Sequence, residues 1–176
     1  MTTTHKTWTK PPYLISTDPS PIPLSTLNTW FASEELYWAK PLPEETLSAI
    51  LHNSLCFGLY KTTTTIAAQP EPEFIGLARC ITDHYTFAYL TDVYVLSAYQ
   101  GQGLGTWLVE CVGATLDAMP DLRRSMLLTM DWERSVPFYE KVLGMNVVES
   151  RLGEDGRREG AAVMSRRGRG STSWVP

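Results

Sequence analysis

The sequence predicts a mixed α/β (α+β) fold, with a largely antiparallel central sheet flanked by helices. Three observations support this class. Short runs rich in β-branched and aromatic residues recur along the chain, several segments carry apolar residues at helical spacing, and a turn with three glycines joins an apolar run to a long helical segment. The 176 residues fit a single domain.

The expected elements follow one another in the order βααβββαβαββ. Each strand is predicted from a short apolar or β-branched run, and each helix from an apolar stripe. The second helix also has a favourable start, because Pro43 precedes Glu44 and Glu45. The strands are expected at residues 13–16, 55–61, 74–82, 85–96, 125–130, 146–152 and 161–164, and the helices at residues 24–32, 43–53, 103–119 and 133–143.

Both ends of the chain are polar and aperiodic. We expect residues 1–12 to form a flexible N-terminus, residues 13–165 the folded domain and residues 166–176 a flexible basic tail. Residues 1–10 contain no apolar run, so we expect neither a secretory signal nor a membrane anchor there. No stretch approaches the roughly 20 apolar residues that cross a bilayer. The cytoplasm follows as the default location.

Charge and cysteine content restrict the partners. Fifteen basic and nineteen acidic residues give a net charge of −4, which argues against nucleic acid as the main partner. Cys56, Cys80 and Cys111 fall in apolar segments and are expected to remain reduced in the core. Edge strands near Val147 and Val163 would allow self-association, so we expect a monomer or a homodimer.

The most informative segment is Gln100-Gly101-Gln102-Gly103-Leu104-Gly105, which follows the apolar run 92–96 and opens a long helix. Such a turn lets backbone N–H groups converge on an anion, and the start of the helix adds partial positive charge. The glycine spacing differs from the dinucleotide-binding fingerprint, and no Lys-Ser or Lys-Thr pair completes a P-loop. We expect a phosphate-binding turn; a tight corner without a ligand is the alternative.

This segment resembles the (Arg/Gln)-x-x-Gly-x-(Gly/Ala) pattern of the GNAT superfamily of N-acetyltransferases, and the element order resembles its fold over residues 13–164. Residues 90–95 and 105–108 are similar to a group of small, mostly uncharacterised members. The resemblance implies acetyl-CoA as co-substrate and direct transfer of its acetyl group to a primary amine in a ternary complex. It also implies that backbone groups near Val95 and Leu96 bind the pantetheine arm, and that the turn holds the pyrophosphate through Gln100, Gly101, Gln102, Gly103, Leu104, Gly105 and Thr106.

Acyl transfer to an amine requires a donor near the departing sulfur, and Tyr139 is the candidate. It lies on the helix where similar enzymes place a phenol beside the coenzyme sulfur. Reference pKa values of about 10 for a phenol and about 8.5 for a thiol make full proton transfer uphill by roughly 2 kcal/mol. We therefore expect a hydrogen bond to the sulfur. A core tyrosine packed beside Phe138 is the alternative.

Asp92 is the first candidate for the base, since similar enzymes often carry an acid at this place in the strand. Direct proton transfer from an ammonium to an ordinary aspartate costs roughly 8 kcal/mol, so Asp92 would act through water, have a raised pKa, or hold the cation. Asp83 and His84 form a second candidate site, because a neutral histidine is a better base near pH 7. A solvated turn is the alternative for these two residues.

In this fold the first helices and their connection would close the acceptor pocket. The residues there are aromatic and acidic, and a second acidic edge surrounds Trp132. They favour a small cationic or aromatic amine. Packing in the core is the alternative for the aromatic rings. The predicted acceptor residues are Phe31, Glu35, Tyr37, Trp38, Asp83, His84 and Trp132.

Two other functions are considered. Residues 136–145 also resemble the helix of vicinal-oxygen-chelate metalloenzymes, but His5, His52 and His84 lack the strand partners of such sites, so no metal is expected. A non-catalytic acyl-CoA sensor or interaction module would lack the donor or the base, and candidates for both are present. The basic tail is expected to be solvated.

Overall fold

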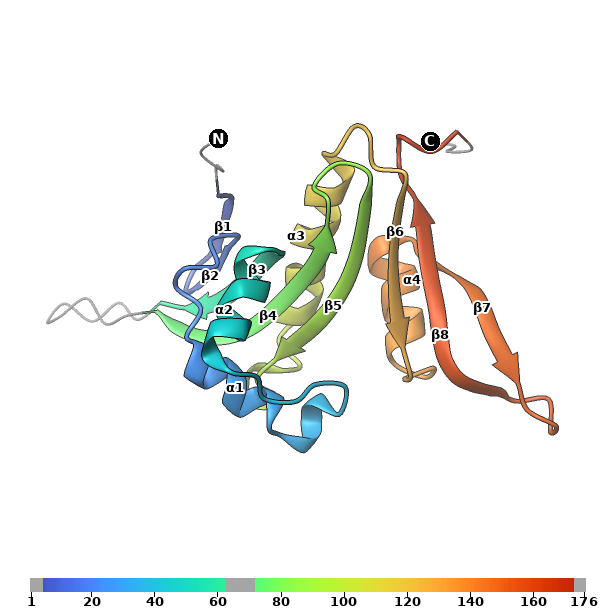
Figure 1. Ribbon diagram of the computed structural model, residues 1–176, viewed down its shortest axis with the longest axis horizontal. Helices are drawn as coiled ribbons and strands as arrows, with labels where there is room; N and C mark the ends of the chain where they lie inside the picture. The colour runs from blue at the N-terminus through green and yellow to red at the C-terminus, as the bar shows by residue number, and fades with distance from the viewer. Residues whose placement is uncertain (1–4, 63–71, 173–176) are drawn as a thin grey trace, which may run out of the picture. The chain divides into compact units, whose positions relative to one another are not determined.

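The computed structural model describes residues 5–62 and 72–172, and the chain divides into two compact units. The first comprises Met1–Arg79 and Asp92–Leu108, and the second comprises Cys80–Thr91 and Val109–Pro176. Strands β4 (Glu73–Thr82) and β5 (Phe87–Val95) and helix α3 (Leu104–Asp117) contribute residues to both units. The strands follow the order β1-β2-β3-β4-β5-β6-β8-β7 (Figure 1). The predicted fold class is confirmed.

The first unit holds the N-terminal strands and helices. Strand β2 pairs antiparallel with both β1 and β3, and β4 and β5 continue the order. Short 3-10 helices lie after α1 and after β5. The remaining bounds are β1 Thr7–Lys10, β2 Tyr13–Ser16, α1 Leu24–Phe31, η1 Glu34–Leu36, α2 Glu44–His52, β3 Leu55–Lys61 and η2 Ser97–Tyr99.

Helices α1 and α2 bury the apolar stripes that predicted them. Leu27, Trp30 and Leu47 lie in one core cluster with Phe74 of β4. The rings of Trp30 and Phe74 stack with centroids 4.5 Å apart and an interplanar angle of 11°. Burial of aromatic rings of this size dominates the stability of a small core. This packing fixes α1, and with it the start of the connection to α2.

The second unit contains β6 (Arg124–Thr129), α4 (Ser135–Leu143), β7 (Asn146–Leu152) and β8 (Arg158–Arg167). Strand β6 pairs parallel with β5 through Phe87–Tyr89 and antiparallel with β8. Strand β7 pairs with β8 alone and is the last strand of the order (Figure 1). Gly144 ends α4 in the left-handed conformation, with φ 62°, as a glycine at this position commonly does.

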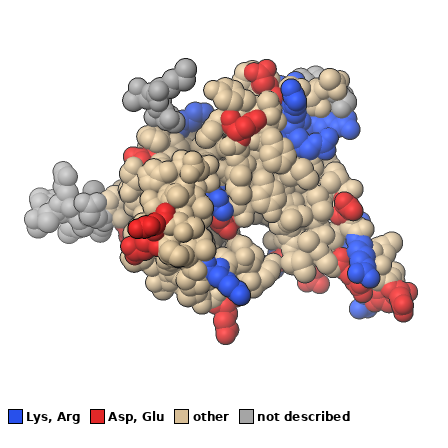
Figure 2. Space-filling model, in the orientation of Figure 1, with Lys and Arg blue, Asp and Glu red and all other residues tan. Residues whose placement is uncertain are grey.

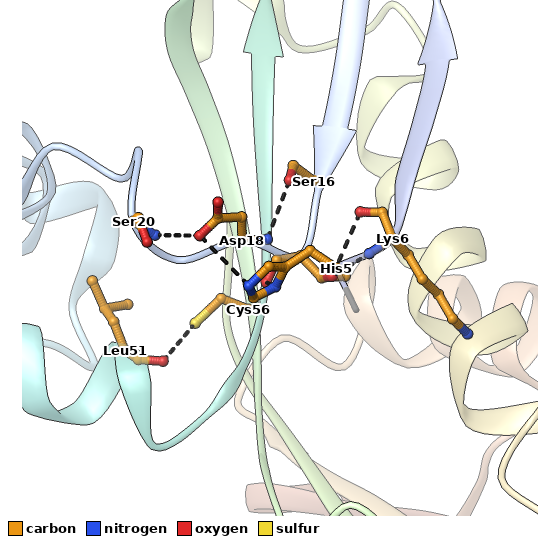
Figure 3. Close-up of polar contacts among 8 residues, drawn as sticks. His5, Lys6, Ser16, Asp18, Ser20, Leu51 and Cys56 are labelled. Carbon is orange, nitrogen blue, oxygen red and sulfur yellow. Dashed lines mark hydrogen bonds and ion pairs between the residues drawn. The ribbon is translucent and has the colours of Figure 1, made fainter. Parts of the chain in front are cut away.

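The N-terminus corrects one prediction. Within the range expected to be flexible, β1 pairs with β2, and the Lys6 N–H donates to Thr17 Oγ1 at 2.8 Å. His5 contacts the Thr17 carbonyl at 3.2 Å and lies 3.9 Å from Asp18 (Figure 3). Threonine favours strands, and Trp8 supplies an apolar side, so this short polar segment forms a strand and not the predicted flexible end. Residues 1–4 of that range lie outside the described residues.

Other boundaries differ by a few residues. Strand β8 is longer than the predicted 161–164 and includes Arg166, a residue of the predicted tail. Arg166 forms an ion pair of 2.9 Å with Asp117. Helices α3 and α4 are each shorter than predicted, which is common at frayed ends. Residues 173–176 of the expected tail are outside the described residues. No helix in the described part is long and apolar enough to span a membrane.

Candidate functional site

The glycine turn has the backbone that an anion site needs. Gly101 and Gly103 adopt φ values of 76° and 78°, a region that side chains disfavour. A Cβ atom built at either position would have no neighbour within 4 Å, so the turn presents bare backbone with open space around it. Glycine is required here by conformation and not by crowding.

The start of α3 supplies the donors. Its first backbone hydrogen bond runs from the Trp107 N–H to the Gly103 carbonyl at 3.0 Å. The N–H groups of Leu104, Gly105 and Thr106 therefore have no acceptor within the helix, as in the first turn of any α-helix. With the partial positive charge of the helix start, they form a cradle suited to a pyrophosphate.

Side chains brace this turn. Gln100 donates through Nε2 to the Val95 carbonyl at 2.7 Å, and the Tyr13 hydroxyl donates to Gln102 Oε1 at 3.0 Å. Both predicted glutamines therefore hold the turn in shape through their side chains, while their backbone belongs to the cradle. Preorganised donors bind an anion without a cost for ordering the loop.

The backbone of Leu96 corrects a detail of the predicted pantetheine site. Its N–H donates to the Ile75 carbonyl at 2.9 Å, and its carbonyl accepts from the Tyr99 N–H at 2.8 Å. The Leu96 N–H is thus engaged with β4. The ladder between β5 and β6 comprises Phe87–Tyr89, so Val95 lies beyond it. The Val95 carbonyl accepts from Gln100 Nε2, so both predicted pantetheine contacts have backbone groups engaged within the protein.

Two lysines beside the turn were not predicted. Lys10, Tyr13 and Lys61 are register partners across β1, β2 and β3. Lys10 Nζ lies 4.9 Å from the ring centre of Trp107, and Lys61 Nζ lies 5.2 Å from that of Tyr99. The two rings belong to residues on either side of the turn, so cations flank it. Both lysines lie far from the turn in the sequence, so no local pattern could predict that they lie beside it.

Glu35 is tied to the end of β5. The Tyr94 hydroxyl donates to Glu35 Oε2 at 2.7 Å, and the Ser97 hydroxyl contacts both carboxylate oxygens at 2.8 Å. These hydrogen bonds, that from Tyr94 first, hold the pKa of Glu35 below its usual value. Glu35 is exposed and stays ionised, so it presents negative charge next to Leu96. Tyr94 and Ser97 were not predicted.

The predicted aromatic acceptor residues separate into two groups. Tyr37 and Trp38, just after η1, are exposed and meet edge to face with ring centres 5.0 Å apart. Phe31 is buried with the core cluster, which corrects its assignment to an acceptor surface. The segment that carries Glu35 therefore offers two exposed rings and a fixed carboxylate, a combination that suits a cationic amine.

Asp92 makes an ion pair that the sequence did not reveal. Arg79 reaches its Oδ2 through both Nε and Nη2 at 2.7 Å, and Arg79 Nη1 donates to Ser54 Oγ at 2.9 Å. Both charged side chains are largely buried, at 12% and 10% exposure. Asp92 also has φ 50°, an uncommon conformation inside a strand. A carboxylate that already compensates a buried guanidinium is poorly available to hold a second cation.

Tyr139 belongs to the second unit. It is half-buried on α4, and its ring meets that of Phe138 edge to face at 5.0 Å. Burial, followed by the nearby Cys80, raises the pKa of the phenol, so it remains a neutral donor at neutral pH. Residues 5–62 and 72–172 offer the Tyr139 hydroxyl no hydrogen bond that competes with a ligand.

The remaining predicted residues of the second unit have structural partners. Asp83 accepts from the Thr86 hydroxyl and from the backbone N–H groups of residues 85–87, and these bonds, that from the hydroxyl first, strongly lower its pKa. His84 lies beside it with φ 65°, so the pair shapes the turn between β4 and β5. Trp132 donates to the Gly160 carbonyl at 2.8 Å and lies under Arg158. In the described part of the chain, no three His, Cys, Asp or Glu residues gather as metal ligands.

The chain resembles known acetyltransferases in sequence and in structure. The model of the Acetyltransferase (GNAT) family matches residues 26–145. A candidate acetyltransferase of Gibberella zeae is 40% identical over 152 residues, covering 81% of this chain and 84% of the relative. A candidate GNAT acetyltransferase from Xanthomonas campestris pv. campestris, known as a crystal structure, is 31% identical, covers 74% of this chain and 84% of its own, and gives a TM-score of 0.57.

A more distant structure shows the fold alone. The spermidine N-acetyltransferase from Vibrio cholerae, solved with CoA and spermine, is 16% identical over 93% of this chain and 94% of its own, with a TM-score of 0.63. The family match covers more than half of the chain and includes the glycine turn, α3 and Tyr139. The chain therefore belongs to the GNAT family and is an N-acetyltransferase.

Proposed function

We propose that this N-acetyltransferase transfers the acetyl group of acetyl-CoA directly to a primary amine of a small cationic acceptor. The observation that carries the proposal is the glycine turn with its free N–H groups at the start of α3. The turn fits a pyrophosphate, and Lys10 and Lys61 add positive charge beside it. Acetyl-CoA supplies the activated thioester.

The acceptor is held by charge and aromatic rings. The fixed carboxylate of Glu35 attracts an ammonium group, and Tyr37 and Trp38 offer exposed faces to a cation. The spermidine N-acetyltransferase of the same fold, solved with spermine, gives a first acceptor class to test. Glu35 is a weak base because its pKa is lowered, so it holds a cation while another amine of the acceptor, unprotonated, reacts.

The transfer forms one bond and breaks another. The amine nitrogen attacks the thioester carbonyl, the new N–C bond forms, the C–S bond breaks, and the amine proton passes to water. Tyr139 donates a hydrogen bond to the departing sulfur, because its raised pKa favours hydrogen bonding over proton loss.

The first experiment is calorimetric titration with acetyl-CoA. We expect a dissociation constant of about micromolar order for the unaltered protein and at least about 100-fold weaker binding for Gly103→Glu, whose carboxylate meets the phosphates. Gly103→Gln is the matched control, because it places a side chain of similar size at φ 78° without the charge, and it should bind acetyl-CoA more tightly than Gly103→Glu. Absence of binding to the unaltered protein would refute the coenzyme assignment.

The acceptor is tested on the same protein. Spermine, spermidine and a neutral aromatic amine are compared as acceptors, with release of free CoA thiol as the readout. We expect the cationic amines to have the higher kcat/KM, because the carboxylate of Glu35 attracts their ammonium groups. Equal or better use of the neutral amine would refute the cationic acceptor and leave the coenzyme assignment standing.

A further inference from the structure

Arginines gather where β8 ends beside the start of β6, within the second unit. Arg166 and Arg167 end β8, Arg124 begins β6, and Arg123 and Arg169 lie just outside these strands. Arg166 is half-buried and the other four are exposed. Figure 2 shows basic atoms gathered at the upper right, where Figure 1 places the end of β8. We call these five residues the arginine patch.

The backbone beyond β8 is held in place, although the sequence predicted a flexible tail there. The Gly168 N–H donates to the Arg123 carbonyl at 3.0 Å, and the Gly170 N–H donates to the Leu122 carbonyl at 2.8 Å. A Cβ atom built at Gly168 would clash with the Leu122 carbonyl, so a glycine is needed for this close approach. The arginine patch is therefore built on two strands and their hydrogen-bonded extension.

Two of these arginines form a row with an aromatic ring. Phe87, Arg124 and Arg167 are register partners across β5, β6 and β8, so their side chains project from the same face of the sheet. The Phe87 side chain is exposed at 39%. Arg124 Nη1 also donates to Ser165 Oγ at 3.5 Å. Like charges directly opposite each other repel, and an anion bound to both guanidinium groups would relieve that repulsion.

The local charge has the opposite sign to that of the whole chain. Residues 83–87, 117–124 and 165–172 hold five arginines and three aspartates, a charge of +2, whereas the whole chain carries −4. Two of these aspartates are already engaged, Asp83 by hydrogen bonds within its turn and Asp117 by its ion pair. The net charge that argued against nucleic acid as the main partner therefore does not describe this surface.

The row matches the chemistry of a single-stranded nucleic acid. Its phosphates accept charge-assisted hydrogen bonds from arginine, and its unpaired bases stack on exposed aromatic rings. A duplex keeps its base faces stacked inside, and an acidic peptide would use the arginines alone. We propose that the arginine patch and Phe87 bind a single-stranded nucleic acid, with phosphates on Arg124 and Arg167 and a base on Phe87.

Fluorescence anisotropy of a labelled oligoadenylate of about 12 nucleotides tests this proposal on the full chain. We expect a dissociation constant on the order of 10 μM at low salt. Arg124→Gln/Arg167→Gln should weaken binding at least about tenfold and reduce the salt slope by about 0.7 for each lost phosphate contact. Phe87→Leu should weaken binding at least about fivefold and leave the salt slope unchanged, because stacking releases no counterions.

Arg151→Gln/Arg157→Gln is the matched control. It removes the same charge from exposed positions near the other end of β8, roughly 30 Å away along the strand, and should bind like the unaltered chain. Calorimetric titration with acetyl-CoA should give the same affinity for every variant, which shows that the fold is kept. This readout also separates the proposal from the assignment of the coenzyme.

Four results would overturn the proposal. The first is that the unaltered chain fails to bind the oligonucleotide, and the second is that the control variant loses as much affinity as Arg124→Gln/Arg167→Gln. The third is equal affinity for a duplex of the same length, which would leave Phe87 without a role. The fourth is binding to vesicles of phosphatidylserine and phosphatidylcholine without binding to the oligonucleotide, which would assign the patch to a membrane surface.

Discussion

At the scale of single residues, Tyr139 carries the prediction most directly linked to chemistry. Tyr139→Phe removes the hydroxyl and leaves the ring contact with Phe138. We expect kcat to fall about 10- to 100-fold with little change in KM, because the hydrogen bond to the sulfur strengthens in the transition state. Steady-state kinetics with acetyl-CoA checks this.

Tyr85→Phe is the matched control, since Tyr85 is an exposed tyrosine of the same unit. The folding stability of Tyr139→Phe should equal that of the unaltered protein, because the described residues give the hydroxyl no hydrogen bond to lose. Unchanged kcat in Tyr139→Phe would assign this tyrosine to packing alone.

Glu35 carries a prediction about charge and pH. Glu35→Gln should weaken binding of spermine about tenfold while acetyl-CoA binding stays unchanged. The folded pKa of Glu35 lies below the ordinary 4.5, so the carboxylate stays ionised as the pH falls from 7 to 5. The difference between the two proteins should therefore be the same at both pH values, as measured by calorimetry.

The neighbouring Glu34→Gln serves as the control, because it removes the same charge from the same 3-10 helix. If the two variants lose spermine affinity equally, the effect is general electrostatic attraction. The specific arrangement with Tyr94 and Ser97 would then have no role in acceptor binding.

At the scale of elements, the ion pair between Arg79 and Asp92 joins β4 to β5. Asp92→Asn suits the positive φ of this position but leaves a buried guanidinium without its counter-charge. We expect it to lower the free energy of unfolding by about 3 kcal/mol. Arg79→Met/Asp92→Asn removes both charges and should recover part of that loss, as chemical denaturation can measure.

The same pair of variants separates two roles of Asp92. If Asp92 acts by positioning β5, the double variant should recover most of the kcat lost in Asp92→Asn. The reason is that Arg79→Met removes the buried guanidinium that Asp92→Asn leaves without a counter-charge. A double variant that is stable and still inactive at every pH would support the role as base that the sequence suggested.

At the scale of the whole molecule, the chain is acidic, with a net charge of −4, yet its proposed coenzyme is an anion. Local charge resolves this, because Lys10 and Lys61 flank the turn. Replacing each lysine by alanine should raise the dissociation constant of acetyl-CoA about threefold, and the double variant should show a weaker dependence on salt. Lys141→Ala on α4 should have no effect.

Local patterns determined much of this protein from sequence alone. Strands β3 and β7 begin and end where the runs of β-forming residues do, β2 and the start of α1 agree with their predictions, and α2 begins one residue later than predicted. The glycine turn was predictable from the sequence. The positive φ values of Gly101 and Gly103 and the free N–H groups at the start of α3 depend only on residues within a few positions of the turn. The family followed from the same segment.

Only the tertiary structure decided which side chains meet across long sequence distances. Arg79 with Asp92, Glu35 with Tyr94, and Lys10 with Trp107 are brought together by strand pairing and by packing of the first helices. No local period encodes such contacts. The partners of Asp83 lie within four residues of it, whereas those of Glu35 lie about 60 residues away and are set by the fold.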